Sequence, residues 1–166
     1  MMLTLSEMQH DALVEIFNIS IGRAAATMSR MVNEEITLSV PSFNLMNRRE
    51  AAEFLDGGSA RRICGVSQTF EGSFNADAIL MFPEEKSLEI VRMMVGEAVP
   101  LEALNELEQE ALSEIGNIIL NSCIGTMANI IGGKFTCSLP TFHLGTSQEI
   151  LHADENGDEF VLLLHI

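Results

Sequence analysis

The sequence predicts an α/β protein of the α+β type, in which two long helices cover one face of a mainly antiparallel sheet. Two proline-free, apolar-rich segments, 8–32 and 104–131, are each long enough for a helix of about six turns or more. Each is followed by a short turn and then by a stretch, 36–40 or 135–139, in which apolar and polar residues alternate as in a half-buried strand. This repeated order of helix, turn and strand carries the prediction.

A short pattern occurs twice in the chain, and the second occurrence begins 99 residues after the first. In each copy an acidic residue is followed four residues later by Glu, then three residues later by Asn, then 23 residues later by Pro. The two copies are Asp11, Glu15, Asn18 and Pro41, and Glu110, Glu114, Asn117 and Pro140. Many flanking positions are identical in the two copies without any gap, which indicates an internal duplication.

The first half contains further predicted elements between the two copies. Residues 48–55 and 84–96 have helical patterns, and residues 62–70 and 73–82 read as two strands joined by a hairpin turn at Glu71 and Gly72. Pro41 and Pro140 predict an edge or a bend in the strands that they follow, because proline cannot donate a ladder hydrogen bond.

The second half ends on a predicted strand, 160–166, which matches 62–70 in order, and no counterpart of 73–82 follows it. We therefore expect one domain spanning 1–166 and made of two repeats, about 1–98 and 100–166, the second lacking a final strand. The apolar edge left at 160–166 would be open or paired with another molecule, so a homo-oligomer through this strand is a prediction.

Composition excludes several classes of partner. A net charge of −15 with nine Lys and Arg in 166 residues argues against nucleic acid and against an acidic lipid surface. Apolar runs are too short for a spanning helix and the start has no signal-peptide pattern, so we expect a cytoplasmic protein.

Cys64, Cys123 and Cys137 form no CxxC pair, so we expect reduced, mostly buried thiols and no metal site.

The repeated residues form a polar stripe on each long helix, because positions i, i+4 and i+7 share one helix face. An amphipathic helix always has some polar face, yet both copies keep Glu and Asn at the same spacing while other exposed candidates differ, such as Arg23 and Ser122. Asn is a poor helix former, so its presence in both copies asks for a reason. A carboxamide donates and accepts hydrogen bonds and can hold a water molecule, and a carboxylate one turn away can anchor a cation on a partner.

At these residues the chain resembles the CheC, CheX and FliY phosphatases of bacterial and archaeal chemotaxis, whose motif is Asp or Ser, then Glu, Asn and Pro at the same spacing. The first copy matches at every position. The second matches at Glu114, Asn117 and Pro140, but Glu110 stands where the family usually has Asp or Ser. The resemblance covers almost the whole chain and implies a pseudo-two-fold arrangement, and two intact motifs are typical of CheC-type members.

The resemblance implies hydrolysis of the aspartyl phosphate on a CheY-like response-regulator receiver domain. The resemblance implies that Asn orients the attacking water and that Glu pairs with the receiver's active-site Lys. It also implies that the receiver carries the Mg²⁺, so the chain needs no cofactor of its own. The implied catalytic residues are Glu15, Asn18, Glu114 and Asn117, with Asp11 and Glu110 as substrate-docking residues. Because the chain is so acidic, local attraction to the receiver is expected from Arg23, Arg30, Arg48 and Arg49.

Two alternatives remain open at this point. The stripes could bind a receiver, or a CheD-like deamidase, without turnover. Alternatively, the domain could be purely structural and assemble through 160–166; substitution of Asn18 or Asn117 by Ala would then be neutral, and a charge at Leu163 would dissociate the oligomer.

Overall fold

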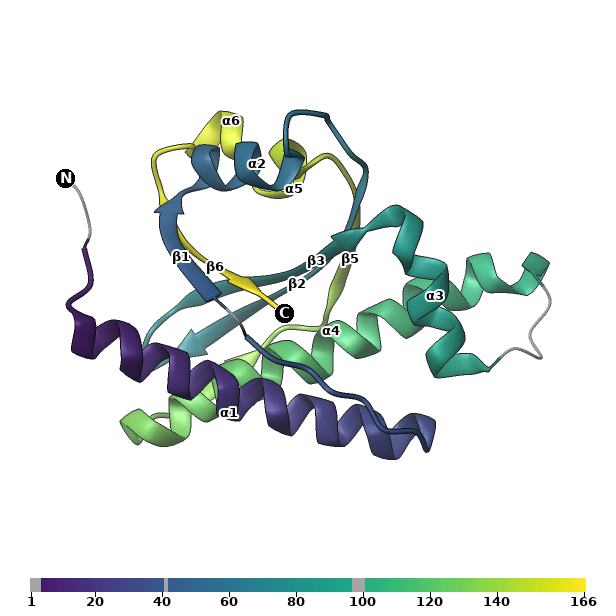
Figure 1. Ribbon diagram of the computed structural model, residues 1–166, viewed down its shortest axis with the longest axis horizontal. Helices are drawn as coiled ribbons and strands as arrows, with labels where there is room; N and C mark the ends of the chain where they lie inside the picture. Colours follow the sequence, from purple (N-terminus) through teal and green to yellow (C-terminus); the bar gives the residue numbers. More distant parts are fainter. Residues whose placement is uncertain (1–3, 41, 97–100) are drawn as a thin grey trace.

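The structure is a computed structural model that describes residues 4–40, 42–96 and 101–166 (Figure 1). Pro41 and the boundary between the repeats, near residues 98–100, lie outside the described residues. The elements in chain order are α1 (Glu7–Val32), β1 (Ser42–Asn47), α2 (Arg48–Asp56), β2 (Ile63–Gly72), β3 (Ala76–Pro83), α3 (Glu84–Val95), α4 (Leu101–Ile131), β4 (Phe135–Cys137), β5 (Thr141–Gly145), α5 (Ser147–Ile150), α6 (Ala153–Asn156) and β6 (Phe160–His165). The mixed helical and antiparallel fold class is confirmed.

The strands form two antiparallel sheets. In the four-stranded sheet β2 is central, with β3 on one side and β4 and β5 in succession on the other. In the second sheet β1 pairs with β6 over six residues, from Ser42 opposite His165 to Asn47 opposite Phe160. A strand of each half thus pairs with a strand of the other half, β5 with β2 and β1 with β6, which is the arrangement that a duplicated unit would produce.

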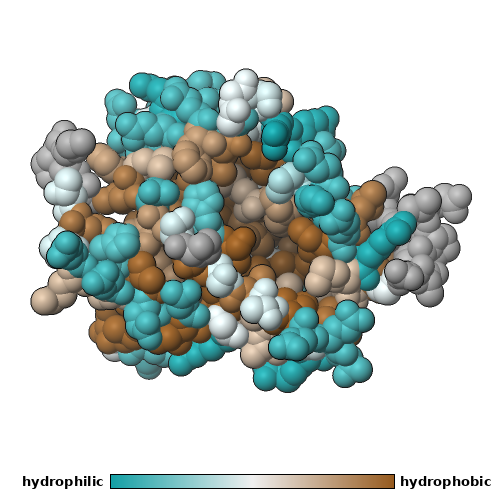
Figure 2. Space-filling model, in the orientation of Figure 1, coloured by the Kyte–Doolittle hydropathy of each residue, from teal (hydrophilic) through white to brown (hydrophobic). Residues whose placement is uncertain are grey.

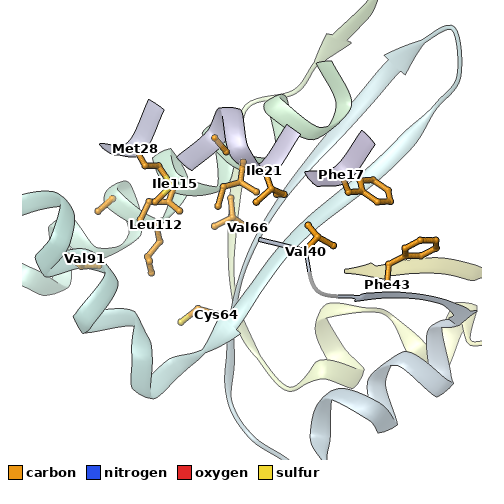
Figure 3. Packing of buried hydrophobic residues seen from close by; sticks show 13 residues of the cluster. Phe17, Ile21, Met28, Val40, Phe43, Cys64, Val66, Val91, Leu112 and Ile115 are labelled. Atoms are coloured by element: carbon orange, nitrogen blue, oxygen red, sulfur yellow. The ribbon is translucent and has the colours of Figure 1, made fainter. Parts of the chain in front are cut away.

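The two long helices run antiparallel to each other beneath the four-stranded sheet in the view of Figure 1. α4 lies directly against β2, β3 and β5, whereas α1 packs mainly along α4. Their shared core is drawn in Figure 3, where Ile21 of α1, Ile115 of α4 and Val66 of β2 converge, all of them buried. Burial of this apolar surface is the main source of stability for the helix pair.

Local signals fix the ends of the helices. α1 begins at a capping box, in which Ser6 accepts a hydrogen bond from the backbone of Gln9 and the Gln9 side chain accepts one from Ser6. It ends at Asn33, whose φ of 55° is the left-handed conformation that terminates helices. α2 has the same kind of box between Asn47 and Glu50 and ends at Gly57.

The predicted strand at 36–40 is wrong, because this segment is extended but pairs with no strand. It lies along α1 instead: the backbone N–H of Ile36 donates to Oγ of Ser29 at 2.8 Å, and Val40 is buried. The strand starts only at Ser42. The alternating pattern was real, and its apolar side chains join the core shared by the long helices and the strands, although the segment itself forms no part of a sheet.

The predicted hairpin turn at Glu71 and Gly72 is also shifted. The pairing of β2 with β3 does end at Phe70 opposite Ala76, but Glu71 and Gly72 continue as strand because they pair with Thr136 and Phe135 of β4. The predicted bend at Pro140 is confirmed, since it lies between β4 and β5 on the edge of the sheet.

The last strand is not left without a partner in the chain, because one edge of β6 pairs with β1. No strand follows β6 within the described residues, and a homo-oligomer through its other edge stays a prediction. Figure 2 shows hydrophobic residues gathered in the middle of one face, with hydrophilic residues above them and a mixture of both kinds below. The exposed apolar side chains include Phe54 of α2 and Leu162 of β6.

The three thiols differ in their surroundings. Cys64 is buried, Cys123 is half-buried and Cys137 is exposed, so the expectation of mostly buried thiols fails for Cys137. All three are free. No described helix has the length and apolar character needed to cross a membrane.

Candidate functional site

The first polar stripe lies on α1, where Asp11, Glu15 and Asn18 are all exposed at i, i+4 and i+7. Asp11 is 3.7 Å from Nδ1 of the neighbouring His10, a contact between exposed groups that adds little stability. Glu15 takes part in no ion pair among the described residues, so its carboxylate is available to a partner's cation.

Asn18 is tied to the segment that leads to the motif proline. The backbone N–H of Val40 donates to Oδ1 of Asn18 at 3.2 Å, although the two residues are 22 positions apart. Among the described residues no other contact uses the second lone pair of Oδ1 or the two N–H groups of the carboxamide, which are free for a partner. This contact gives a physical reason for the fixed distance between the motif's Asn and Pro, because the residue before the proline anchors the Asn.

The second stripe lies on α4, where Glu110 and Glu114 are exposed and Asn117 is half-buried. Neither carboxylate is in an ion pair within the described part of the chain. The helix therefore presents the same groups in the same order as α1, but with its Asn set deeper against the sheet.

Two residues that the sequence reasoning missed surround Asn117. Nε2 of Gln68, from β2, donates to Oδ1 of Asn117 at 3.0 Å, and Nδ2 of Asn121 donates to the same oxygen at 2.7 Å. Gln68 also donates to the carbonyl of Ser138 at 2.9 Å, two residues before the motif proline. The second Asn is thus anchored through Gln68 rather than by a backbone N–H of that segment.

The edge strand bulges beside this network. Phe70 pairs with Cys137 and Ser67 pairs with Thr141, so two residues of β2 face the three residues Ser138 to Pro140. A bulge of this kind redirects side chains, and here it leaves Leu139 86% exposed. Its counterpart in the first copy, Val40, is 4% exposed. The two sites therefore differ in the apolar surface around them.

Of the four arginines expected near the first stripe, two lie on the same helix as the stripe and two lie on another helix. Arg23 and Arg30 lie on α1, where Arg23 donates to Thr126 of α4 at 3.3 Å. Arg48 and Arg49 lie on α2, and they contact Glu159 at 2.9 Å and Asp158 at 3.9 Å. In Figure 1 α2 lies across the sheets from α1, so Arg48 and Arg49 do not belong to the first site.

No group of three or more His, Cys, Asp and Glu side chains that could hold a metal ion occurs in the described ranges. What the stripes offer is an exposed carboxylate and, one turn away, a carboxamide fixed from outside the helix. Such a pair can anchor a cation and orient a water molecule.

Comparison with known proteins places this arrangement in a family. Residues 64–163 match the family described as chemotaxis phosphatase CheX, and residues 8–45 match the CheC-like family. The chain is 27% identical over 143 residues to the CheY-P phosphatase CheC of Bacillus subtilis, covering 84% of this chain and 68% of that protein.

Solved structures share the fold. FliY of Thermotoga maritima superposes with a TM-score of 0.78 at 20% identity, covering 98% of this chain and 83% of that one. CheX in the CheX-CheY-BeF3-Mg+2 complex of Borrelia burgdorferi gives a TM-score of 0.57 at 18% identity, covering 93% and 89%. The CheX model alone spans more than half of the chain, and the chain therefore belongs to the CheC, CheX and FliY family of chemotaxis phosphatases.

Proposed function

We propose that the chain hydrolyses the aspartyl phosphate of a CheY-like receiver domain, with one site on α1 and a second on α4. The observation that carries the proposal is the repeated pair of an exposed Glu and an Asn whose Oδ1 is held by an N–H from outside its own helix. Family membership supports it, since the relative CheC is named for action on CheY-P.

In this proposal the Glu side chain docks the receiver. Glu15 and Glu114 are exposed and unpaired among the described residues, so each can accept hydrogen bonds from a Lys of the receiver's active site. Asp11 and Glu110 lie one turn earlier on the same faces and extend the docking surface.

The Asn side chain positions the attacking water. The water oxygen bonds to phosphorus while the bond from phosphorus to the aspartyl oxygen breaks, which yields inorganic phosphate and a free carboxylate. Mg²⁺ belongs to the receiver, which is the substrate. The chain's own contribution is the orientation of Asn18 or Asn117, which lowers the entropic part of the barrier.

The test is the decay of phosphate from a panel of phosphorylated receiver domains at substoichiometric protein. Wild type should accelerate decay with many turnovers, and the double variant Asn18→Ala and Asn117→Ala should return decay to the receiver's own rate. Asn129→Ala is a matched control, because Asn129 is exposed on α4 outside the stripe.

The alternatives predict other outcomes. Binding of a receiver, or of a CheD-like deamidase, without turnover would replace the phosphatase by an adaptor. Equal activity of wild type and the double variant would remove the two Asn residues from the mechanism. We place the reaction in the cytoplasm, in line with the expectation drawn from the short apolar runs of the sequence.

A further inference from the structure

Gln68 is a buried polar residue in an otherwise apolar row. Cys64, Val66, Gln68 and Phe70 alternate along β2 with 2% exposure or less, and Val66 contacts α4. A buried carboxamide is costly unless all its polar groups are paired. The amide of Gln68 meets this condition, because it donates to Asn117 and to Ser138. Nδ2 of Asn121 donates at 2.7 Å to the carbonyl and to Oδ1 of Asn117, and the Oε1 of Gln68 lies 3.3 Å from the same nitrogen.

This pairing fixes the side chain of Asn117. Its Oδ1 accepts from Gln68 at 3.0 Å and from Asn121 at 2.7 Å, which occupies both lone pairs. If the carboxamide of Asn117 were rotated by 180°, its N–H groups would face the N–H groups of Gln68 and Asn121, and no hydrogen bond could form between donors. The Nδ2 of Asn117 is therefore held away from Gln68 and Asn121, where its N–H groups can donate to another molecule.

We propose that Gln68 is a positioning residue for the second site, acting on Asn117 together with Asn121. The inference rests on the proposed function. The terminal torsion of an Asn side chain is broad, so an unsupported Asn samples many orientations. Holding it in one orientation before the receiver arrives raises the rate of the chemical step without changing receiver binding.

The first site has a weaker version of this device. Asn18 is exposed, and its Oδ1 receives one donor, the backbone N–H of Val40. Gln68 therefore acts on one of the two sites, and its effect is measured with the other site switched off.

The parent protein for the test is Asn18→Ala, in which only the second site operates. Gln68→Met keeps the length of the side chain and removes its hydrogen bonds. We expect kcat for receiver dephosphorylation to fall by about tenfold or more while KM stays within about twofold, because a small misplacement of a positioned group costs rate rather than affinity. Asn121 is half-buried, and Asn121→Ala should likewise lower kcat while leaving KM nearly unchanged. This variant replaces Gln68→Met in the test if Gln68→Met does not fold.

The outcomes separate the two proposals. If wild type accelerates no receiver, the proposed function falls and the positioning role with it. If wild type is active but Asn18→Ala is not, the function stands at the first site and the inference is overturned. If Asn18→Ala is active and kcat is unchanged by both Gln68→Met and Asn121→Ala, Gln68 does not position Asn117. An equal loss when Gln68→Met is placed in Asn117→Ala would indicate general damage and also overturn the inference.

Discussion

Gly116 of α4 lies so close to Val66 of β2 that a Cβ atom at position 116 would stand 2.4 Å from Cγ1 of Val66. Its counterpart in the first copy is Phe17, which is buried and packs edge-on against Phe43 at a ring distance of 5.9 Å. The same motif position thus carries no side chain where α4 lies against Val66 of β2, and a large one where α1 packs against Phe43 of β1. Because Gly116 lets α4 approach β2 closely, the next residue, Asn117, is half-buried against the sheet.

Gly116→Ala should therefore destabilise the protein by about 1–3 kcal/mol, because the added methyl forces helix and strand apart. Gly125→Ala, on the same helix with open space around its Cα, should be neutral or stabilising by up to about 1 kcal/mol through helix propensity. Chemical denaturation of the two variants measures the difference. Equal stability of the Gly116→Ala and Gly125→Ala variants would contradict the prediction, because it would show that Val66 moves aside for the added methyl group at little cost.

Leu139 should serve receiver docking at the second site, because an 86% exposed Leu beside Asn117's network gains by burial against a partner. In the Asn18→Ala background, Leu139→Ser should raise KM about five- to tenfold with little change in kcat or in melting temperature. Steady-state kinetics at varied receiver concentration provides the measurement. An unaltered KM would remove Leu139 from the docking surface.

Thiol reactivity should follow burial. Burial raises the pKa of the Cys64 thiol, with Glu108 and Glu84 adding to the rise, and burial also raises the pKa of Cys123. A raised pKa leaves less thiolate at a given pH, so both should react slowly, whereas Cys137 is exposed. At pH 8 a thiol reagent should modify one cysteine quickly and the other two slowly, until unfolding exposes all three. Cys137→Ser should abolish the fast phase, and its persistence would contradict the assignment.

The oligomer prediction needs a different residue from the one the sequence suggested. Leu163 is 8% exposed, so a charge there should unfold the protein, and Leu163→Ala should cost about 2–5 kcal/mol. Leu162 is 39% exposed on the same strand. If copies assemble through β6, Leu162→Glu should lower the mass in sedimentation while the melting temperature is kept. A wild type that sediments as a monomer would end the prediction.

Much of the fold followed from periodic patterns. The helices α1 and α4, and the strands β2 and β3, lie within a few residues of their predicted ranges, because capping residues and apolar spacing act locally. The segment at 36–40 was misassigned because alternation reports two different sides and does not say whether a strand or a helix covers the apolar one.

The arrangement of the candidate site was predictable in part through the same kind of local rule. Helical spacing put Glu15 and Asn18, and Glu114 and Asn117, on common faces. Gln68 was missed because it is 49 residues from Asn117, and no spacing rule links a strand to a distant helix. Its one signal was a Gln within the alternating apolar row of β2.

The two anchors also differ in when they can form. Asn18 and Val40 are 22 residues apart, whereas Gln68 reaches Asn117 and Ser138 over 49 and 70 residues. Contacts between near neighbours close quickly and those between distant segments close late. The support of the first Asn therefore closes a short loop within one repeat, while the support of the second Asn forms only when both halves of the chain have come together.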